Sequence, residues 1–259
     1  MKRLSYGVFA NRVIRNNRHF FDEDVQGFLD FIARSFPERV CTLPKDYQLW
    51  RAQLGYDTEP EIHDGEEYGE VSVPWGPTRM VPDATKVREG RANPRGIAYL
   101  YLSNSKETAM HEVRPWTGSV LSAAVFKTTQ EQKLVDFSVF HGEKHPQISL
   151  SSLFEEPTED QIQKDVWISV DNAFSEPVPN NEDPTKYIPT QIIAELVKRE
   201  GYDGIAYKSV FSDGFNIVLF DVNAVSLIYC SMYNATDVKM SFCQEEGTYA
   251  EYWVNQKST

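Results

Sequence analysis

The chain has 259 residues, of which 41% are hydrophobic and 25% charged, a composition typical of a folded globular protein. Asp and Glu number 38 against 26 for Lys and Arg, which gives a formal net charge of −12. Because affinity for duplex DNA and for anionic membranes depends on basic surfaces, this charge argues against both partners. Any anionic ligand would need arginines that are concentrated locally.

Cysteine and histidine are sparse and scattered. Cys41, Cys230 and Cys243 are too few for a disulfide framework or a zinc site, and the five histidines form no HExxH cluster. We therefore predict no metal site. The opening residues MKRLSYGVFANRVIRNN contain no long apolar run, so we expect neither a signal peptide nor a membrane anchor, and a cytoplasmic location.

The first third of the chain divides into a helix and an irregular region. Residues 20–36 have helical spacing, with acidic residues in the first turn and Pro37 at the end; the expected apolar stripe is Phe21, Val25, Phe28, Leu29, Ile32 and Phe36. Residues 56–95 are rich in Asp, Glu, Gly and Pro and show no sustained period. We interpret them as a long ordered loop or insertion.

The rest of the chain alternates strand and helix signals irregularly. A helix is expected from Pro189, near its first turn, to Gly201, a natural residue just past its C-terminus. Shorter or acidic helical pieces are expected at 105–113 and 155–168, a Pro/Asn-rich loop at 177–184, and strands at 97–103, 120–126, 133–139, 203–208, 215–221 and 224–230. Without regular βαβ alternation, this pattern favours an α+β fold with mixed or antiparallel sheets and flanking helices.

Three segments carry candidate chemistry. The loop GRANPRG at 90–96 can present the Arg91 guanidinium at the start of a strand, where it suits a phosphate or carboxylate, although two solvated arginines are the simpler interpretation. Glu112 lies beside the apolar stripe of the helix at 105–113, where a carboxylate is most often a surface group. Ser209 ends a predicted strand in YKSVFSDGFN, where serine is usually a turn or cap residue. No GxSxG elbow surrounds it, so Ser209 suits hydrogen bonding better than covalent attack.

Read together, these segments resemble the RES domain family, which is named for an Arg, a Glu and a Ser. The match runs from GRANPRGIAYLYLSNSKETAMHEVRP to YIPTQIIAELVKREGYDGIAYKSVFSDGFNIVLFD and maps the three residues to Arg91, Glu112 and Ser209, with the family's tyrosine at Tyr101. LWRAQLG at 49–55 resembles the family's opening strand, which adds Arg51. The resemblance places an N-terminal helical extension at 1–45, the RES domain at 46–231 and a packed C-terminal extension at 232–259.

The resemblance implies a fold similar to ADP-ribosyltransferases and a toxin that breaks down NAD by phosphorolysis or hydrolysis. NAD is then substrate rather than cofactor, inorganic phosphate a co-substrate of the phosphorolytic route, and a cognate antitoxin protein a partner. Cleavage releases neutral nicotinamide from a pyridinium, so one carboxylate that stabilises a cationic ribose suffices, and Glu112 has that role. Arg91 and Arg51 would hold phosphate groups, while Tyr101 would stack on a base or position the ribose.

Ser209 would hydrogen-bond a ribose hydroxyl or the nicotinamide amide, and Asn216, in the same segment, is a further substrate-binding candidate. Two other interpretations stay open. An ADP-ribosyltransferase that modifies a macromolecule is disfavoured by the lack of an ExE or QxE triplet beside Glu112. A catalytically silent acidic interaction protein would need its carboxylates on one face, whereas here they are scattered.

Overall fold

The computed structural model describes residues 5–145, 157–176 and 183–239, and its centre is an eight-stranded sheet. The strand order is β1-β7-β8-β9-β5-β2-β6-β10, and every neighbouring pair is antiparallel except β7 and β8. The predicted α+β class with a mixed sheet is confirmed. The strands are β1 (Val40–Leu43), β2 (Gln48–Leu54), β5 (Leu100–Ser103), β6 (Val120–Thr128), β7 (Gln132–Asp136), β8 (Gly204–Lys208), β9 (Phe215–Leu219) and β10 (Val225–Asn234).

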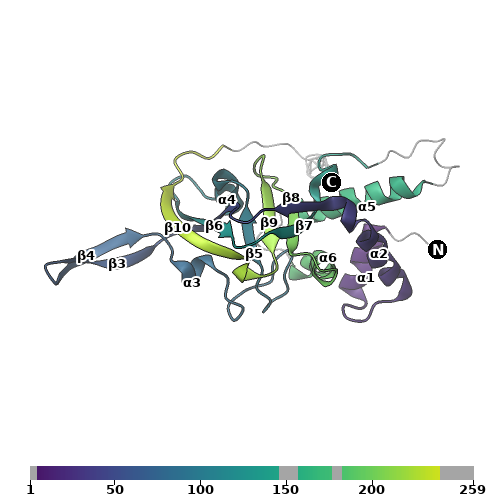
Figure 1. Ribbon diagram of the computed structural model, residues 1–259, viewed down its shortest axis with the longest axis horizontal. Helices are drawn as coiled ribbons and strands as arrows, with labels where there is room; N and C mark the ends of the chain where they lie inside the picture. The colour runs from purple at the N-terminus through teal and green to yellow at the C-terminus, as the bar shows by residue number, and fades with distance from the viewer. Residues whose placement is uncertain (1–4, 146–156, 177–182, 240–259) are drawn as a thin grey trace, which may run out of the picture.

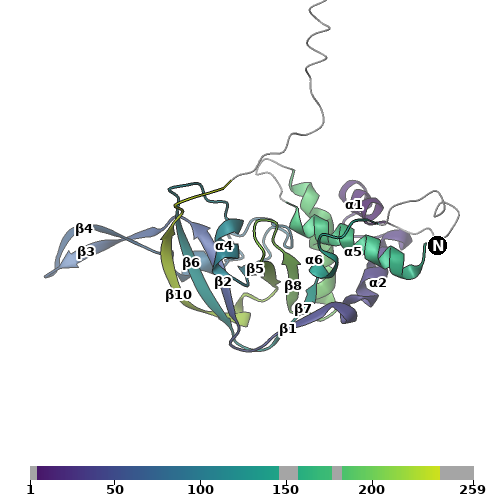
Figure 2. The ribbon, with the colours of Figure 1, turned by 90° about the horizontal axis from the view of Figure 1, so that it is seen from above.

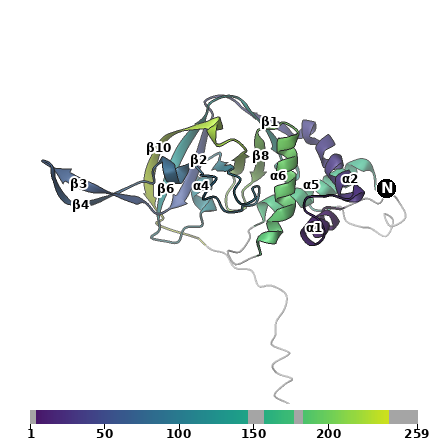
Figure 3. The ribbon, with the colours of Figure 1, turned by 90° about the horizontal axis from the view of Figure 1, so that it is seen from below.

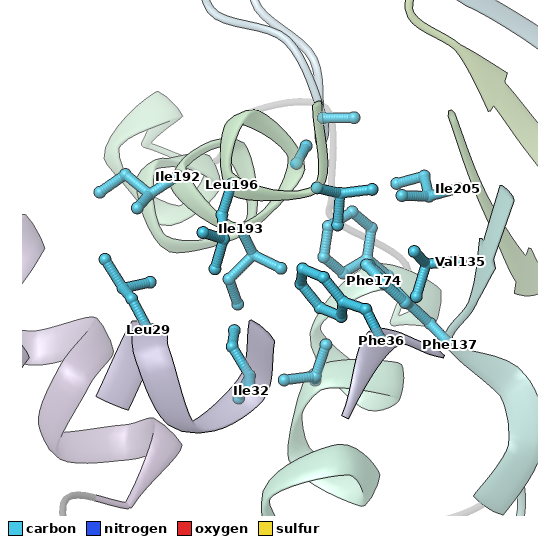
Figure 4. Packing of buried hydrophobic residues seen from close by; sticks show 14 of the residues in the cluster. Leu29, Ile32, Phe36, Val135, Phe137, Phe174, Ile192, Ile193, Leu196 and Ile205 are labelled. Carbon is cyan, nitrogen blue, oxygen red and sulfur yellow. The ribbon is translucent and has the colours of Figure 1, made fainter. Parts of the chain in front are cut away.

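The long helices gather at one end of the molecule, as Figure 1 shows. They are α1 (Tyr6–Arg15), α2 (Glu23–Arg34), α5 (Glu159–Ser175) and α6 (Ile188–Arg199). Their apolar faces meet the β7–β8–β9 part of the sheet in one core, which includes Leu29, Phe137 and Ile193 (Figure 4). Seen from below, α6 lies next to β8, with α1 and α2 beyond it (Figure 3). None of the helices in the described ranges is both long and apolar enough to cross a bilayer.

Local sequence signals explain how these helices begin and end. Asp22 caps α2 by accepting a hydrogen bond from the Val25 amide at 2.8 Å, and the four members of the predicted stripe that lie within this helix are buried, whereas Phe21 precedes the helix and Phe36 follows it. Pro189 lies in the first turn of α6, and Gly201 follows that helix with a φ of +87°, a conformation that glycine adopts without strain. The sequence reasoning missed α1, although Ser5 caps it through the Val8 amide at 3.4 Å.

Residues 56–95, which we predicted as a long ordered loop or insertion, contain regular structure that the sequence did not indicate. They contain a two-stranded hairpin of β3 (Asp57–His63) and β4 (Glu66–Val73), followed by the short α3 (Pro77–Met80). The hairpin projects away from the body of the molecule (Figure 2). Nearly all its side chains are exposed, so the strands lack the alternation of buried and exposed residues on which the prediction relied. The Asp64–Gly65 dipeptide was the sequence signal for this hairpin, because both residues have the positive φ that a two-residue hairpin turn requires.

Other boundaries differ by a few residues. The strand expected at 97–103 begins only at Leu100, and the acidic helical piece expected at 155–168 continues to Ser175 as α5. The strand expected at 133–139 ends at Asp136, because the Asp136 carboxylate accepts hydrogen bonds from the amide and hydroxyl of Ser138, at 2.8 and 2.6 Å, and turns the chain. Most of the loop expected at 177–184, and the chain beyond residue 239, lies outside the described residues.

Candidate active site

A cleft of about 280 Å³ lies where β2 separates from β5. Among the described residues these strands pair only at Trp50 and Ser103, whereas β2 pairs with β6 along its whole length. The helix α4 (Lys106–Glu112) packs beside the gap, against β2, β5 and β9. The charged and polar residues of the cleft wall therefore come from α4 and from strands that are far apart in the sequence, and they include Arg51, Gln53, Tyr101, Ser103, Glu112, Tyr207 and Asn216.

Glu112 is held at the C-terminal end of α4 by two donors. The Ser209 hydroxyl donates to Glu112 Oε1 at 2.6 Å, and the Asn216 amide Nδ2 donates to the same oxygen at 2.7 Å. The other oxygen, Oε2, accepts no hydrogen bond from the described residues. Glu112 is half-buried and lines the cleft, so its orientation is fixed while one oxygen stays free for a ligand.

The two donors reach Glu112 because the loop between them is pressed against α4. A Cβ at Gly214 would lie 1.9 Å from the Thr108 hydroxyl oxygen, so only glycine fits there. The Ser212 hydroxyl donates to the same Thr108 oxygen at 2.8 Å. This close approach brings Ser209, at the end of β8, and Asn216, in β9, to the end of the helix.

A row of cross-strand neighbours forms one wall of the cleft. Trp50, Ser103, Asn216 and Tyr207 are register partners on β2, β5, β9 and β8 in turn. The Ser103 hydroxyl donates to Asn216 Oδ1 at 3.0 Å, which leaves the amide nitrogen to face Glu112. The sequence reasoning missed Trp50, Ser103 and Tyr207, since only the register between the strands places them together.

Arg51 supplies a buried positive charge in the cleft. Its Nη1 donates to the Tyr101 carbonyl at 3.0 Å, whereas its Nε is buried without a partner among the described residues. Burial, with a further contribution from the neighbouring Arg79 charge, lowers the pKa of Arg51 to about 10, so the guanidinium remains charged at neutral pH. A half-buried cation in the wall of a cleft is suited to an anionic ligand.

Tyr101 presents its ring, and not its hydroxyl, to the cleft. The hydroxyl donates to Asn93 Oδ1 at 2.7 Å and accepts from the Ala92 amide at 2.9 Å, both in the 90–96 loop. Burial raises the pKa of this hydroxyl far above its ordinary value, so it stays protonated. A Cβ at Gly90 would lie 2.8 Å from the hydroxyl oxygen, and the glycine therefore lets the loop close on Tyr101.

Arg91 does not line the cleft. Its guanidinium donates to the Ala173 carbonyl at 3.0 Å and to the Glu176 carbonyl at 2.6 Å, at the C-terminal end of α5. Arg95, in the same loop, is exposed. The structure therefore brings Glu112, Ser209, Asn216, Arg51 and the Tyr101 ring together at the cleft. Arg91 lies outside the cleft wall.

These features define an α+β domain with a ligand cleft built around one fixed carboxylate. The family model described as "RES domain" matches residues 48–232, and the chain belongs to this family. Among solved structures, a chain of the M. tuberculosis MbcT–MbcA toxin–antitoxin complex is similar at 10% identity and a TM-score of 0.39, over 80% of this chain and 93% of that one. No curated protein matches the chain.

Proposed function

We propose that this protein is an enzyme that cleaves the bond between nicotinamide and ribose in NAD. The observation that carries the proposal is Glu112, which lines a cleft beside the Arg51 cation; Ser209 and Asn216 fix its Oε1, whereas Oε2 accepts no hydrogen bond from the described residues. Among the described residues that line the cleft, Glu112 is the one carboxylate. This favours departure of a neutral leaving group, because an O-glycosidase needs a second carboxyl group as acid.

Each residue has a defined part in the proposed reaction. The carbon–nitrogen bond breaks, its electron pair neutralises the pyridinium, and nicotinamide departs. The Glu112 carboxylate stabilises the positive charge that develops on the ribose, an electrostatic contribution that requires no proton transfer. An oxygen of inorganic phosphate or of water then bonds to the same carbon; with water, a proton is released. Arg51 would bind the pyrophosphate of NAD or the attacking phosphate through its guanidinium charge at the cleft wall.

The experiment is to incubate the full chain with NAD and to follow nicotinamide by chromatography, with and without inorganic phosphate. Nicotinamide release that depends on phosphate, with an ADP-ribose phosphate ester as product, supports phosphorolysis; free ADP-ribose supports hydrolysis. Transfer of ADP-ribose to a macromolecule, or no nicotinamide at all, overturns the proposal. In Arg51→Ala we expect the KM for NAD or phosphate to rise about tenfold, and Arg88→Ala, which removes an exposed arginine, is the matched control.

We further propose that the protein acts as a toxin in the bacterial cytoplasm, where NAD is its substrate, and that a cognate antitoxin restrains it. Membership in the RES domain family supports this proposal. Expression of the wild type should deplete cellular NAD and arrest growth, whereas Glu112→Gln at equal abundance should do neither. Growth arrest without NAD loss would contradict the proposed link between the activity and the toxicity.

A further inference from the structure

The C-terminal end of α5 is bound by Arg91. The two carbonyls that Arg91 contacts, those of Ala173 and Glu176, lie in the last turn of α5 and just after it. Carbonyls at a helix C-terminus lack intrahelical donors and carry the negative end of the helix dipole, so a guanidinium there is favourable. Arg91 thus fixes where this helix ends.

The same end of α5 holds the strand that carries Ser209. The Ser175 side chain is buried, and its hydroxyl donates to the Lys208 carbonyl at 3.1 Å. Lys208 is the last residue of β8 and precedes Ser209, whose hydroxyl donates to Glu112 at 2.6 Å. A continuous path therefore runs from the Arg91 guanidinium through the end of α5 and the end of β8 to the Glu112 carboxylate.

Arg91 is itself mounted on a rigid support. Its carbonyl accepts a hydrogen bond from the Thr190 hydroxyl at 2.6 Å, at the start of α6. The Gln191 amide Nε2 donates to the carbonyls of Gly90 and Asn93, at 2.9 and 3.0 Å. The loop is thus fastened to one helix and holds the end of another, which is the arrangement of a structural brace rather than of a mobile ligand clamp.

We propose that Arg91 is a positioning residue: it fixes the end of α5, and α5, through Ser175, fixes the end of β8 so that Ser209 holds Glu112 in its reactive orientation. This inference rests on the proposed NAD-cleaving function. It differs from the role that the family resemblance implies, in which Arg91 itself binds a phosphate. The two roles make opposite predictions, because a positioning residue affects kcat and a ligand-binding residue affects KM.

The first test is a double-mutant cycle in the full chain with Arg91→Ala, Ser175→Ala and the double variant. Each single change should lower kcat about three- to tenfold and leave the KM for NAD and phosphate within about twofold, and the double variant should lose little more than Arg91→Ala alone. Arg91→Lys, which keeps a cation at the helix end, should recover part of kcat. Ser169→Ala is the matched control, since among the described residues the Ser169 hydroxyl bonds only to the Asp165 carbonyl within α5.

Two kinetic results would overturn the inference. One is a raised KM in Arg91→Ala with kcat unchanged, the signature of direct phosphate binding. The other is multiplication of the losses in the double variant, which would mean that Arg91 and Ser175 act independently. Should Arg91→Ala fold poorly, Arg91→Lys and Ser175→Ala decide the question by the same split between kcat and KM.

A second measurement does not need activity. Hydrogen exchange followed by mass spectrometry should show faster exchange in Arg91→Ala at peptides covering the end of α5 and residues 205–211, with β6 unchanged. If the wild type releases no nicotinamide, the proposed function fails while this comparison still tests the brace. Unchanged exchange at residues 205–211 would show that Arg91 does not fix the end of β8.

Discussion

Two carboxylates of this protein each accept hydrogen bonds from two side chains, yet their surroundings differ. Ser209 and Asn216 donate to one oxygen of Glu112, at 2.6 and 2.7 Å, and its other oxygen accepts no hydrogen bond from the described residues. Asp171, in α5, is 1% exposed, with His141 Nδ1 at 2.7 Å from Oδ2 and the Ser175 hydroxyl at 3.4 Å from Oδ1.

The difference separates the proposed catalytic carboxylate from a structural one. Both oxygens of Asp171 are used within the protein, and burial raises the pKa of its carboxyl, partly opposed by His141 and Ser175. Hydrogen bonding alone therefore does not identify a catalytic carboxylate. The distinguishing feature of Glu112 is that hydrogen bonds to one carboxylate oxygen fix its orientation, while the other oxygen accepts no hydrogen bond from the described residues.

The largest effect that tests this comparison concerns turnover. We expect Glu112→Gln to lower kcat for NAD cleavage by at least about 10²-fold, the scale for removing one electrostatic group at a transition state. Asp171→Asn keeps an oxygen for Ser175 and should change kcat less than about threefold. Steady-state nicotinamide release measures kcat of both variants. Equal losses of kcat in the two variants would show that Glu112 and Asp171 do not differ in their importance for turnover.

The two carboxylates should rank in the opposite order when their variants are compared by the free energy of unfolding. Asp171→Ala removes the buried acceptor of the His141 ring nitrogen and one of the two acceptors of the Ser175 hydroxyl, so we expect the free energy of unfolding to fall by about 1–3 kcal/mol. Glu112→Ala removes a half-buried group and should cost less than about 1 kcal/mol. Urea unfolding followed by circular dichroism gives both values, and a larger loss for Glu112→Ala would reverse our assignment of the structural carboxylate.

The donors of Glu112 provide a sharper and smaller test. Ser209→Ala removes one of two hydrogen bonds to Oε1 and should lower kcat about tenfold with little change in KM, because Ser209 contacts the carboxylate. Ser169→Ala again serves as the serine control. A rise in KM with unchanged kcat would instead place the Ser209 hydroxyl on the substrate, as the sequence analysis expected.

The smallest effect is a dependence of stability on pH. Because the folded-state pKa of Asp171 is raised, this group contributes most stability below the ordinary carboxyl pKa, and the contribution is lost as pH rises through the raised value. The titratable and charged groups that interact electrostatically with Asp171 are His141, Asp136 and Arg39. The unfolding free energy of the wild type relative to Asp171→Asn should therefore fall from pH 4 to pH 7, with His141→Gln as control. A difference that grows over this range would contradict the raised pKa.

Several features of the fold and site could be read from the sequence because their signals are local. The apolar stripe and acidic start of α2, and Pro189 and Gly201 at the ends of α6, act within one or two helical turns. The family resemblance directed attention to Glu112, Ser209 and Asn216, which the structure brings into contact. The acidic hairpin of β3 and β4 escaped prediction because it has no buried face, and a period of two in hydrophobicity requires one.

By itself the sequence indicated α2, α5, α6 and most strands of the sheet, and it pointed to one carboxylate as the candidate catalytic group. Tertiary structure decided what each side chain of the site does. The Arg91 guanidinium meets carbonyls 82 and 85 residues away, and Ser209 meets a carboxylate 97 residues away. Such contacts depend on strand register and on the docking of α5, and no pattern confined to a few neighbouring residues contains that information.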